Sequence, residues 1–355
     1  MKKSFLVVLF VMLAASMFAA DLSVTLEAGV LVNKGGLYAR PAQTTDESEY
    51  TGAFSVAYDG ESFGGMMEFR TEASASPYAY VAATKDNFFF VRGYQVYVKP
   101  CQEVKLSIDT CAYELLAENI SWEPLHAASI FECTQTPHVV VTWDVDAHLQ
   151  IIAGIDTTLT DRRKVWTGAG ALATYEVFGL GKFIGKFEFL DEKLDTGATW
   201  DAGLAFQLLA LDTQDVYAGY SLIMNKLNPV QHRIEAFYGL NLDALTFSFF
   251  DSLEIKTEND TVIGNRAALK VAYTIDSITP SLAINYYHNF GGGGHIWGAP
   301  DISSDSTTFC DIINIDPRVS FAFGQGTLST GARVTLDLLS GGFSWYIPLG
   351  ISVSL

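Results

Sequence analysis

The stretch that most constrains this sequence is residues 343–355, FSWYIPLGISVSL, where large apolar residues alternate with small or polar ones. A period of two places all the apolar side chains on one face of an extended strand. Such a strand is long for a soluble protein, but it can cross a bilayer at the tilt of a barrel, for which about 9–11 residues suffice. The stretch therefore predicts a membrane-crossing β-strand whose apolar face carries Phe343, Trp345, Ile347, Leu349, Ile351, Val353 and Leu355.

The same alternation begins at residues 22–32 and recurs along the chain. Counting these runs predicts about eighteen strands, with sixteen as the alternative, because short or split strands are easily miscounted. Besides residues 22–32 and 343–355, the runs cover 50–58, 63–70, 88–98, 103–109, 138–143, 148–156, 166–177, 182–190, 198–210, 216–224, 231–240, 245–255, 266–275, 281–288, 318–323 and 328–338.

The connections between these runs alternate between tight turns and longer loops. The turns include residues 59–62, 99–102 and 144–147, and the long loops cover 33–49, 71–87, 110–137 and 289–312. Transmembrane barrels have short periplasmic turns and longer extracellular loops. The fold class predicted is therefore all-β: a transmembrane, antiparallel, up-and-down barrel. An even strand number would place both ends of the chain on the periplasmic side.

Pro348 is an awkward residue for the last strand. Proline has no backbone N–H and therefore removes one hydrogen bond from a strand ladder. We expect a local bulge at this position.

Residues 1–20 have the pattern of a secretory signal peptide. Lys2 and Lys3 precede an apolar run at residues 5–15, and small residues follow at Ala19 and Ala20. We therefore expect residues 21–355 to be exported as one barrel domain, and we expect the barrel to lie in the outer membrane in contact with its lipid. No later stretch has the roughly 18 uncharged apolar residues of a membrane helix.

Taken together, these features resemble the porin-type outer-membrane β-barrels of diderm bacteria, of the spirochaete kind. The segment Tyr94-Gln95-Val96-Tyr97-Val98-Lys99-Pro100, followed by Val104-Lys105-Leu106-Ser107-Ile108, is similar to the strand–Lys-Pro–strand hairpins of such barrels. The resemblance covers the mature chain as architecture and includes no family-specific motif. The chain also departs from the family, which usually ends in an aromatic residue, because it ends in Leu355.

The net charge of the mature chain limits which partners it can bind. Removing Lys2 and Lys3 leaves 20 basic against 40 acidic residues and a net charge of −20. This excess repels nucleic acid and favours cations and basic solutes. No nucleophile elbow, phosphate-binding loop, dinucleotide fingerprint or paired-histidine zinc motif occurs. We therefore expect no enzyme activity, no cofactor and no metal site.

A barrel of sixteen to eighteen strands is too wide for its own side chains to fill, which leaves an aqueous channel. Charges at every second position of otherwise apolar strands indicate which face lines that channel. The interior residues predicted in this way are Glu68, Lys105, Lys186, Glu188, Arg233, Glu235, Arg266, Lys270 and Arg333.

The third long loop, residues 110–137, resembles in position the loop that folds into general porins and narrows them. It carries Glu114, Glu118, Glu123 and Glu132. Our hypothesis is that it enters the channel and sets these carboxylates against Arg233, Arg266, Lys270 and Arg333. Such a transverse field would orient and filter polar solutes. The alternative, a solvated external cap, fits the sequence equally well.

The four cysteines decide little. Cys111 and Cys133 fall in the same loop, and a disulfide between them is one interpretation in an oxidising compartment. Free thiols are the other.

The leading functional hypothesis is a porin that passes small hydrophilic solutes or ions by diffusion and prefers cations. One alternative is a surface-exposed barrel that acts in adhesion or outer-membrane anchoring. A third interpretation is an exported soluble β-sandwich that binds a ligand. The sequence leaves the assembly state open, with a homotrimer among the arrangements to test.

Overall fold

A computed structural model gives the architecture. It describes residues 22–33, 36–39, 50–72, 90–110, 113–114, 126–130, 138–156, 168–190, 199–208, 213–225, 230–257, 261–288, 311–339 and 341–354. The division into a signal peptide (1–20) and one barrel domain (21–355) stays a prediction, since residues 1–21 lie outside the described part.

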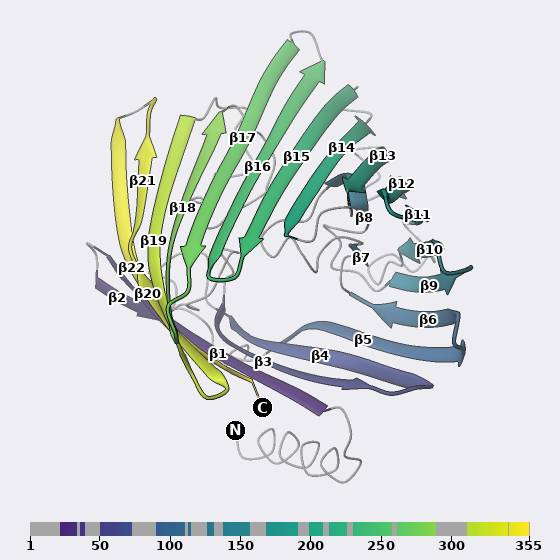
Figure 1. Cartoon of the computed structure of the whole chain (residues 1–355), viewed down its shortest axis with the longest axis horizontal. Helices are drawn as coiled ribbons and strands as arrows, with labels where there is room; N and C mark the ends of the chain where they lie inside the picture. The colour runs from purple at the N-terminus through teal and green to yellow at the C-terminus, as the bar shows by residue number, and fades with distance from the viewer. Residues whose placement is uncertain are drawn as a thin grey trace.

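Nearly all of the described chain forms one antiparallel sheet that closes on itself. β1 pairs with β3 on one side and with β22 on the other, which joins the first strand to the last. Figure 1 shows the resulting ring, which runs from β1 through β4, β9 and β13 round to β22. The strands are β1 (Leu22–Asn33), β2 (Gly36–Ala39), β3 (Tyr50–Asp59), β4 (Phe63–Glu72), β5 (Phe90–Cys101), β6 (Val104–Asp109), β9 (His138–Asp144), β10 (Leu149–Asp156), β11 (Gly168–Val177), β12 (Gly181–Leu190), β13 (Thr199–Leu208), β14 (Gln214–Asn225), β15 (Val230–Leu242), β16 (Leu245–Thr257), β17 (Thr261–Tyr273), β18 (Ile278–His288), β19 (Asp311–Phe323), β20 (Gly326–Gly331), β21 (Arg333–Asp337) and β22 (Gly342–Ser354).

Within the described residues, the 20 strands of this sheet occupy eighteen positions around the ring. β2 and β3 pair with successive parts of the same side of β1. β20 and β21 likewise lie one after the other between β19 and β22. The predicted up-and-down barrel of about eighteen strands is therefore confirmed.

The two ends of the ring differ in their connections. Residue 25 pairs with residue 354, so the first and last strands start and finish at the same end, which we call the terminal end. Strands joined at the terminal end are separated by only two to five residues, whereas the connections at the opposite end include residues 73–89, 110–137 and 289–310. The predicted alternation of tight turns and longer loops is thus confirmed.

The break between β20 and β21 has a physical cause in two prolines. Ala332 lies opposite Pro317 of β19, and Gly331 comes opposite Pro348 when the register of β22 is continued between its paired residues. Neither proline has an N–H to donate, so each removes one hydrogen bond of the ladder at this height, although the amide of Ala332 still donates to the carbonyl oxygen of Pro317 at 3.0 Å. The predicted bulge at Pro348 is wrong, since β22 pairs with β1 in continuous register through Leu31 and Pro348.

β19 is much longer than the predicted run of residues 318–323. The predicted run does not extend over its first half, because Asn314, Asp316 and Pro317 are poor strand formers. In the structure this half pairs along its length with β18, from Asp311 opposite His288 to Pro317 opposite Leu282. Pairing on both sides overrides local propensity here.

The polarity of the sheet is inverted relative to a water-soluble protein. On β9, Val139, Val141 and Trp143 are exposed, while His138 and Val140, which alternate with them, are fully buried. On β12, Phe183 and Phe187 are exposed, and Lys186 is 5% exposed. An apolar outer belt around a closed sheet is the surface that a bilayer requires. No helix in the described part is both long and apolar enough to cross a membrane.

Candidate functional site

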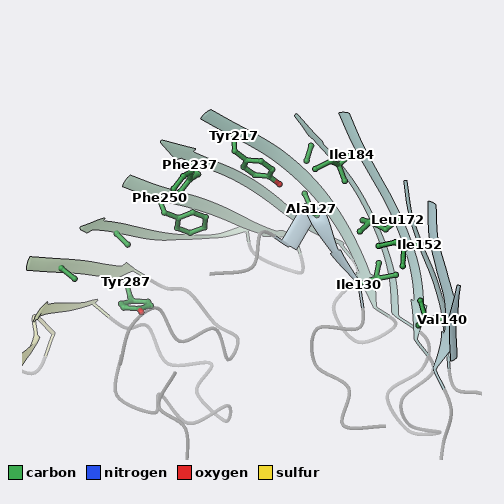
Figure 2. Close-up of a cluster of buried hydrophobic side chains, with 14 of the residues drawn as sticks. Ala127, Ile130, Val140, Ile152, Leu172, Ile184, Tyr217, Phe237, Phe250 and Tyr287 are labelled. Carbon is green, nitrogen blue, oxygen red and sulfur yellow. The ribbon is translucent and has the colours of Figure 1, made fainter. Parts of the chain in front are cut away.

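The site is the inner wall of the ring. The predicted interior residues whose side chains the structure describes all lie on this face, as the alternation along each strand shows. Most of them are buried or half-buried. Figure 2 shows Leu172, Ile184, Tyr217, Phe237 and Phe250 on the same concave side. The predicted residues found on the inner face are Lys105, Lys186, Glu188, Arg233, Glu235, Arg266, Lys270 and Arg333.

Part of the third long loop lies inside the ring. The 3-10 turn η2 (His126–Ala128) and the short strand β8 (Ser129–Ile130) contact β11, β12, β13 and β14. Ala127 and Ile130 are fully buried, next to Ile152, Leu172 and Ile184 on the concave side of the sheet (Figure 2). We call residues 126–130 the inner segment.

Two wall residues hold the inner segment by its backbone. Lys186 Nζ donates to the carbonyl oxygen of Ser129 at 3.0 Å, and the amide of Ala127 donates to Glu235 Oε2 at 3.3 Å. Both interactions involve a charged group, which makes them stronger than neutral hydrogen bonds. The sequence reasoning placed both residues on the wall but did not foresee this role.

Two glycines make room for the inner segment. A Cβ added at Gly203 would lie 3.1 Å from Ala127 Cα, and one added at Gly219 would lie 2.9 Å from Ala127 Cβ. The backbone of Ala127 can therefore approach the wall only because these two positions have no side chain.

Wall carboxylates pair with the wall's basic residues. Asp316 accepts hydrogen bonds from two guanidinium groups, with Arg333 Nη2 at 2.6 Å and Arg318 Nε at 2.8 Å. Lys186 Nζ lies 2.7 Å from Asp201 Oδ2, and all these side chains except Arg318 are almost fully buried. Burial of these charges is tolerated because each has an opposite charge in contact.

A second cluster joins β15 and β16. Arg233 Nη2 lies 4.0 Å from Glu254 Oε2, and Lys256 Nζ lies 2.9 Å from Glu254 Oε1. Arg233 and Arg333 thus pair with carboxylates of the wall itself.

Two further basic residues of the wall lie over aromatic rings. Arg266 lies over the ring of Phe250 at 5.7 Å, and Lys105 lies over the ring of Tyr97 at 5.5 Å.

Charge is unevenly distributed around the wall. On β17 to β21 the described inner charges are four basic residues and two carboxylates: Arg266, Lys270, Arg318, Arg333, Asp316 and Asp337. On β9 to β16 they are four basic residues and eight carboxylates: Lys182, Lys186, Arg233, Lys256, Asp144, Asp156, Glu176, Glu188, Asp201, Asp215, Glu235 and Glu254. A solute inside the ring would therefore meet a basic wall opposite a more acidic one.

Several predicted residues cannot be placed. Glu118, Glu123, Glu132, Cys111 and Cys133 lie outside the described residues. For Glu114 and Glu68 the structure describes the backbone alone. Glu114 pairs with Ser129 in the small sheet of β7 (Tyr113–Glu114) and β8, and Glu68 lies on β4. The predicted contact between loop glutamates and wall arginines, and the Cys111–Cys133 disulfide, stay predictions.

Sequence reasoning missed Asp201, Glu254 and Asp316, although each forms an ion pair on the wall. Strand parity would have found Asp201 and Glu254, because each alternates along its strand with the apolar residues of the outer face. Asp316 was missed because it lies outside the predicted run of residues 318–323. In the described part of the chain, no group of three or more His, Cys, Asp or Glu is arranged to hold a metal ion.

Comparison with known proteins gives structural matches alone. No family model matches the chain, and no curated protein matches it. A BenF-like porin from Pseudomonas fluorescens superposes with a TM-score of 0.59 at 10% identity, covering 94% of this chain and 98% of that one. The chain has the fold of a porin-type outer-membrane β-barrel.

Two Pseudomonas aeruginosa proteins show the same likeness to this porin-type barrel. OccK2 (OpdF), solved in complex with glucuronate, has a TM-score of 0.58 at 11% identity and covers 94% of this chain and 97% of its own. The outer membrane protein opdK has a TM-score of 0.57 at 9% identity, with 94% and 98% covered. At these identities the likeness concerns the fold.

Proposed function

We propose that the protein is an outer-membrane porin that lets small hydrophilic solutes diffuse through its ring. The observation that carries the proposal is the closed ring of eighteen strand positions with an apolar outer face and a charged inner face. Rings of this size leave a water-filled passage in membrane barrels. Charged side chains on the inner face are favourable only where water or counter-charges reach them.

We further propose a preference for cations. The acidic excess of the whole chain supports it, and so do the eight carboxylates against four basic residues on the inner face of β9 to β16. The basic wall of β17 to β21 opposes them and would contact an acidic group of a passing solute. Glucuronate, which OccK2 binds in its crystal structure, is one acid to test on this wall.

The placement in the outer membrane, the contact with its lipid and a homotrimeric assembly are part of the same proposal. The apolar belt of the outer face supports the lipid contact. Export through residues 1–20 is the route that the sequence pattern indicates.

The alternative function is adhesion or outer-membrane anchoring. The long connections at the end of the barrel opposite the terminal end would carry it. The inner segment lies inside the ring and so removes residues 126–130 from that outer surface. The soluble sandwich does not agree with the described sheet, which closes into a single ring.

Single-channel conductance of the refolded protein in a planar bilayer, with a salt gradient across it, tests the proposal. We expect stable current steps and a reversal potential that favours cations. Substituting Glu188→Gln and Glu235→Gln should move the reversal potential toward zero, whereas Asp243→Asn, on the exposed β15–β16 turn, should leave it unchanged. Steps without selectivity would remove the cation preference and keep the porin. A folded barrel that carries no current would refute the porin.

A further inference from the structure

The inner segment meets the wall mainly through small side chains. Ala127, Ala128 and Ser129 follow one another in it, and all three are buried. Among residues 127–130, Ile130 brings the one large apolar side chain. Small side chains bury little apolar surface, so hydrophobic burial contributes only part of the attachment. The two charged hydrogen bonds to the wall therefore carry much of it.

The wall beside the inner segment is polar where a permanent contact would be apolar. Ser221 pairs in register with Gly203 and alternates along β14 with Gly219. These are the two glycines that Ala127 approaches. The Ser221 side chain is fully buried, yet its hydroxyl has no hydrogen-bond partner in the described part of the structure. A buried hydroxyl without a partner is unfavourable, and water would supply the partner once the segment left the wall.

Both wall residues that hold the segment have a second partner outside it. Lys186 Nζ lies 2.7 Å from Asp201 Oδ2, closer than the 3.0 Å between Nζ and the carbonyl oxygen of Ser129. Glu235 pairs in register with Ser252, whose buried hydroxyl has no hydrogen-bond partner among the described residues. Directly opposite side chains on one face of a sheet have Cβ atoms about 5 Å apart, within reach of a hydrogen bond. Neither charge is stranded when the segment leaves.

We propose that the inner segment is a gate, which detaches from the wall as a unit while the barrel stays folded. Lys186 and Glu235 are its positioning residues, because their hydrogen bonds favour the attached arrangement. The anchoring charges are satisfied in both arrangements, as a two-state element requires. Detachment does not require that the barrel conduct. Its effect on transport rests on the proposed porin function, in which detachment widens the passage beside β11 to β14.

Hydrogen exchange of the full-length protein, refolded into lipid vesicles and followed by mass spectrometry, measures detachment directly. We expect the amides of residues 127–130 to exchange at least about tenfold faster than the central amides of β12 to β14, because detachment exposes the former without unfolding the latter. Exchange of both sets at one rate would overturn the proposal, since the segment would then leave only when the wall itself unfolds.

The double variant Lys186→Met with Asp201→Asn tests the first anchor. Methionine keeps the length of the side chain and removes the donor, and asparagine avoids a buried carboxylate without its lysine. Losing one charge-assisted hydrogen bond should speed the exchange of residues 127–130 about tenfold. Glu235→Gln keeps the shape of the second anchor and weakens it as an acceptor, so it should speed this exchange about threefold. It also serves as the test if the double variant does not fold.

Lys182→Met is the matched control. It removes a lysine from the same face of β12, four residues nearer the terminal end. Exchange of residues 127–130 should be unchanged in this variant. An equal acceleration in the control, or no acceleration in either anchor variant, would overturn the role of Lys186 and Glu235.

Single-channel recording in a planar bilayer tests the effect on transport. We expect the wild-type channel to alternate between two open levels, and the double variant to raise the ratio of time in the higher level to time in the lower about tenfold. Fast exchange of the segment together with one open level would overturn the effect on transport. A folded barrel that carries no current would refute the porin, and the exchange rates would still decide whether the segment detaches.

Discussion

At the scale of single residues, Asp316 is a wall carboxylate that pairs with two guanidinium groups. It accepts from both Arg333 and Arg318, and its side chain is only 2% exposed. Asp316→Asn would leave the almost fully buried Arg333 without its charge partner, so we expect a loss of about 3 kcal/mol in the free energy of unfolding. Urea titration of the barrel in lipid vesicles measures it. Asp276→Asn, the same change on an exposed turn, should cost less than about 0.5 kcal/mol. Equal effects of the two variants would contradict the pairing.

Asp146 gives a prediction of pH dependence. Its pKa is lowered in the folded protein by the amides of His148 and Leu149, so its contribution to stability is full above the pKa of an unfolded aspartate and is lost as pH falls through the lower folded value. We expect wild type and Asp146→Ala to differ in stability at pH 6 and to converge below about pH 3, near and under the ordinary aspartate pKa. Urea midpoints measured across this range decide it. A difference that persists at low pH would mean that the side chain acts through something other than its charge.

At the scale of elements, the inner segment depends on the absence of side chains at Gly203 and Gly219. Gly203→Val should push residues 126–130 off the wall and, through overpacking, cost about 1–3 kcal/mol. Gly185→Val is the matched control, because a Cβ there meets nothing nearer than Leu204 Cδ2 at 3.7 Å. Stability and single-channel conductance should change in the first variant and stay close to wild type in the second. If both variants behave alike, the inner segment is not held by close approach to Gly203.

The sequence was informative about elements and less so about contacts between them. Strict alternation identified the strands and, by parity, placed Lys186 and Glu235 on the inner wall. It failed for the first half of β19, because Ile312 is apolar on the inner face and Pro317 interrupts the strand pattern. The roles of Gly203 and Gly219 could not be read from the sequence, since they depend on where a distant loop packs. The partners of Arg233 and Arg333 likewise depend on register between strands.

At the scale of the whole molecule, the outer face of the described sheet includes a polar pair on β16 and β17. Asn265 Nδ2 donates to Asp251 Oδ1 at 2.9 Å, and Asp251 lies on the outward face between the buried Phe250 and Ser252. Its same-face neighbours along β16 are Phe249 and Leu253. A carboxylate that faces lipid is unfavourable.

Replacing both members of this pair, Asp251→Leu with Asn265→Leu, should therefore raise stability by about 1 kcal/mol if lipid covers this face. Urea unfolding in vesicles gives the answer, with chemical crosslinking to follow the assembly state. Phe249→Leu is the control, because it changes an apolar residue for another on the same strand. A loss of stability together with a loss of crosslinked oligomer would indicate that a second copy covers Asp251 and would support the proposed homotrimer.

The seam between β1 and β22 also constrains how the barrel can be made. Thr25 and Ser354 are neighbours in the sheet although more than 300 residues separate them in the sequence, so this pairing closes a very long loop. Contacts of such sequence separation form late and slowly. Until the final strand is added, every assembly intermediate has two unpaired edges, each able to recruit a strand from another molecule. We therefore expect a requirement for a cellular helper that shields both edges until the last strand arrives.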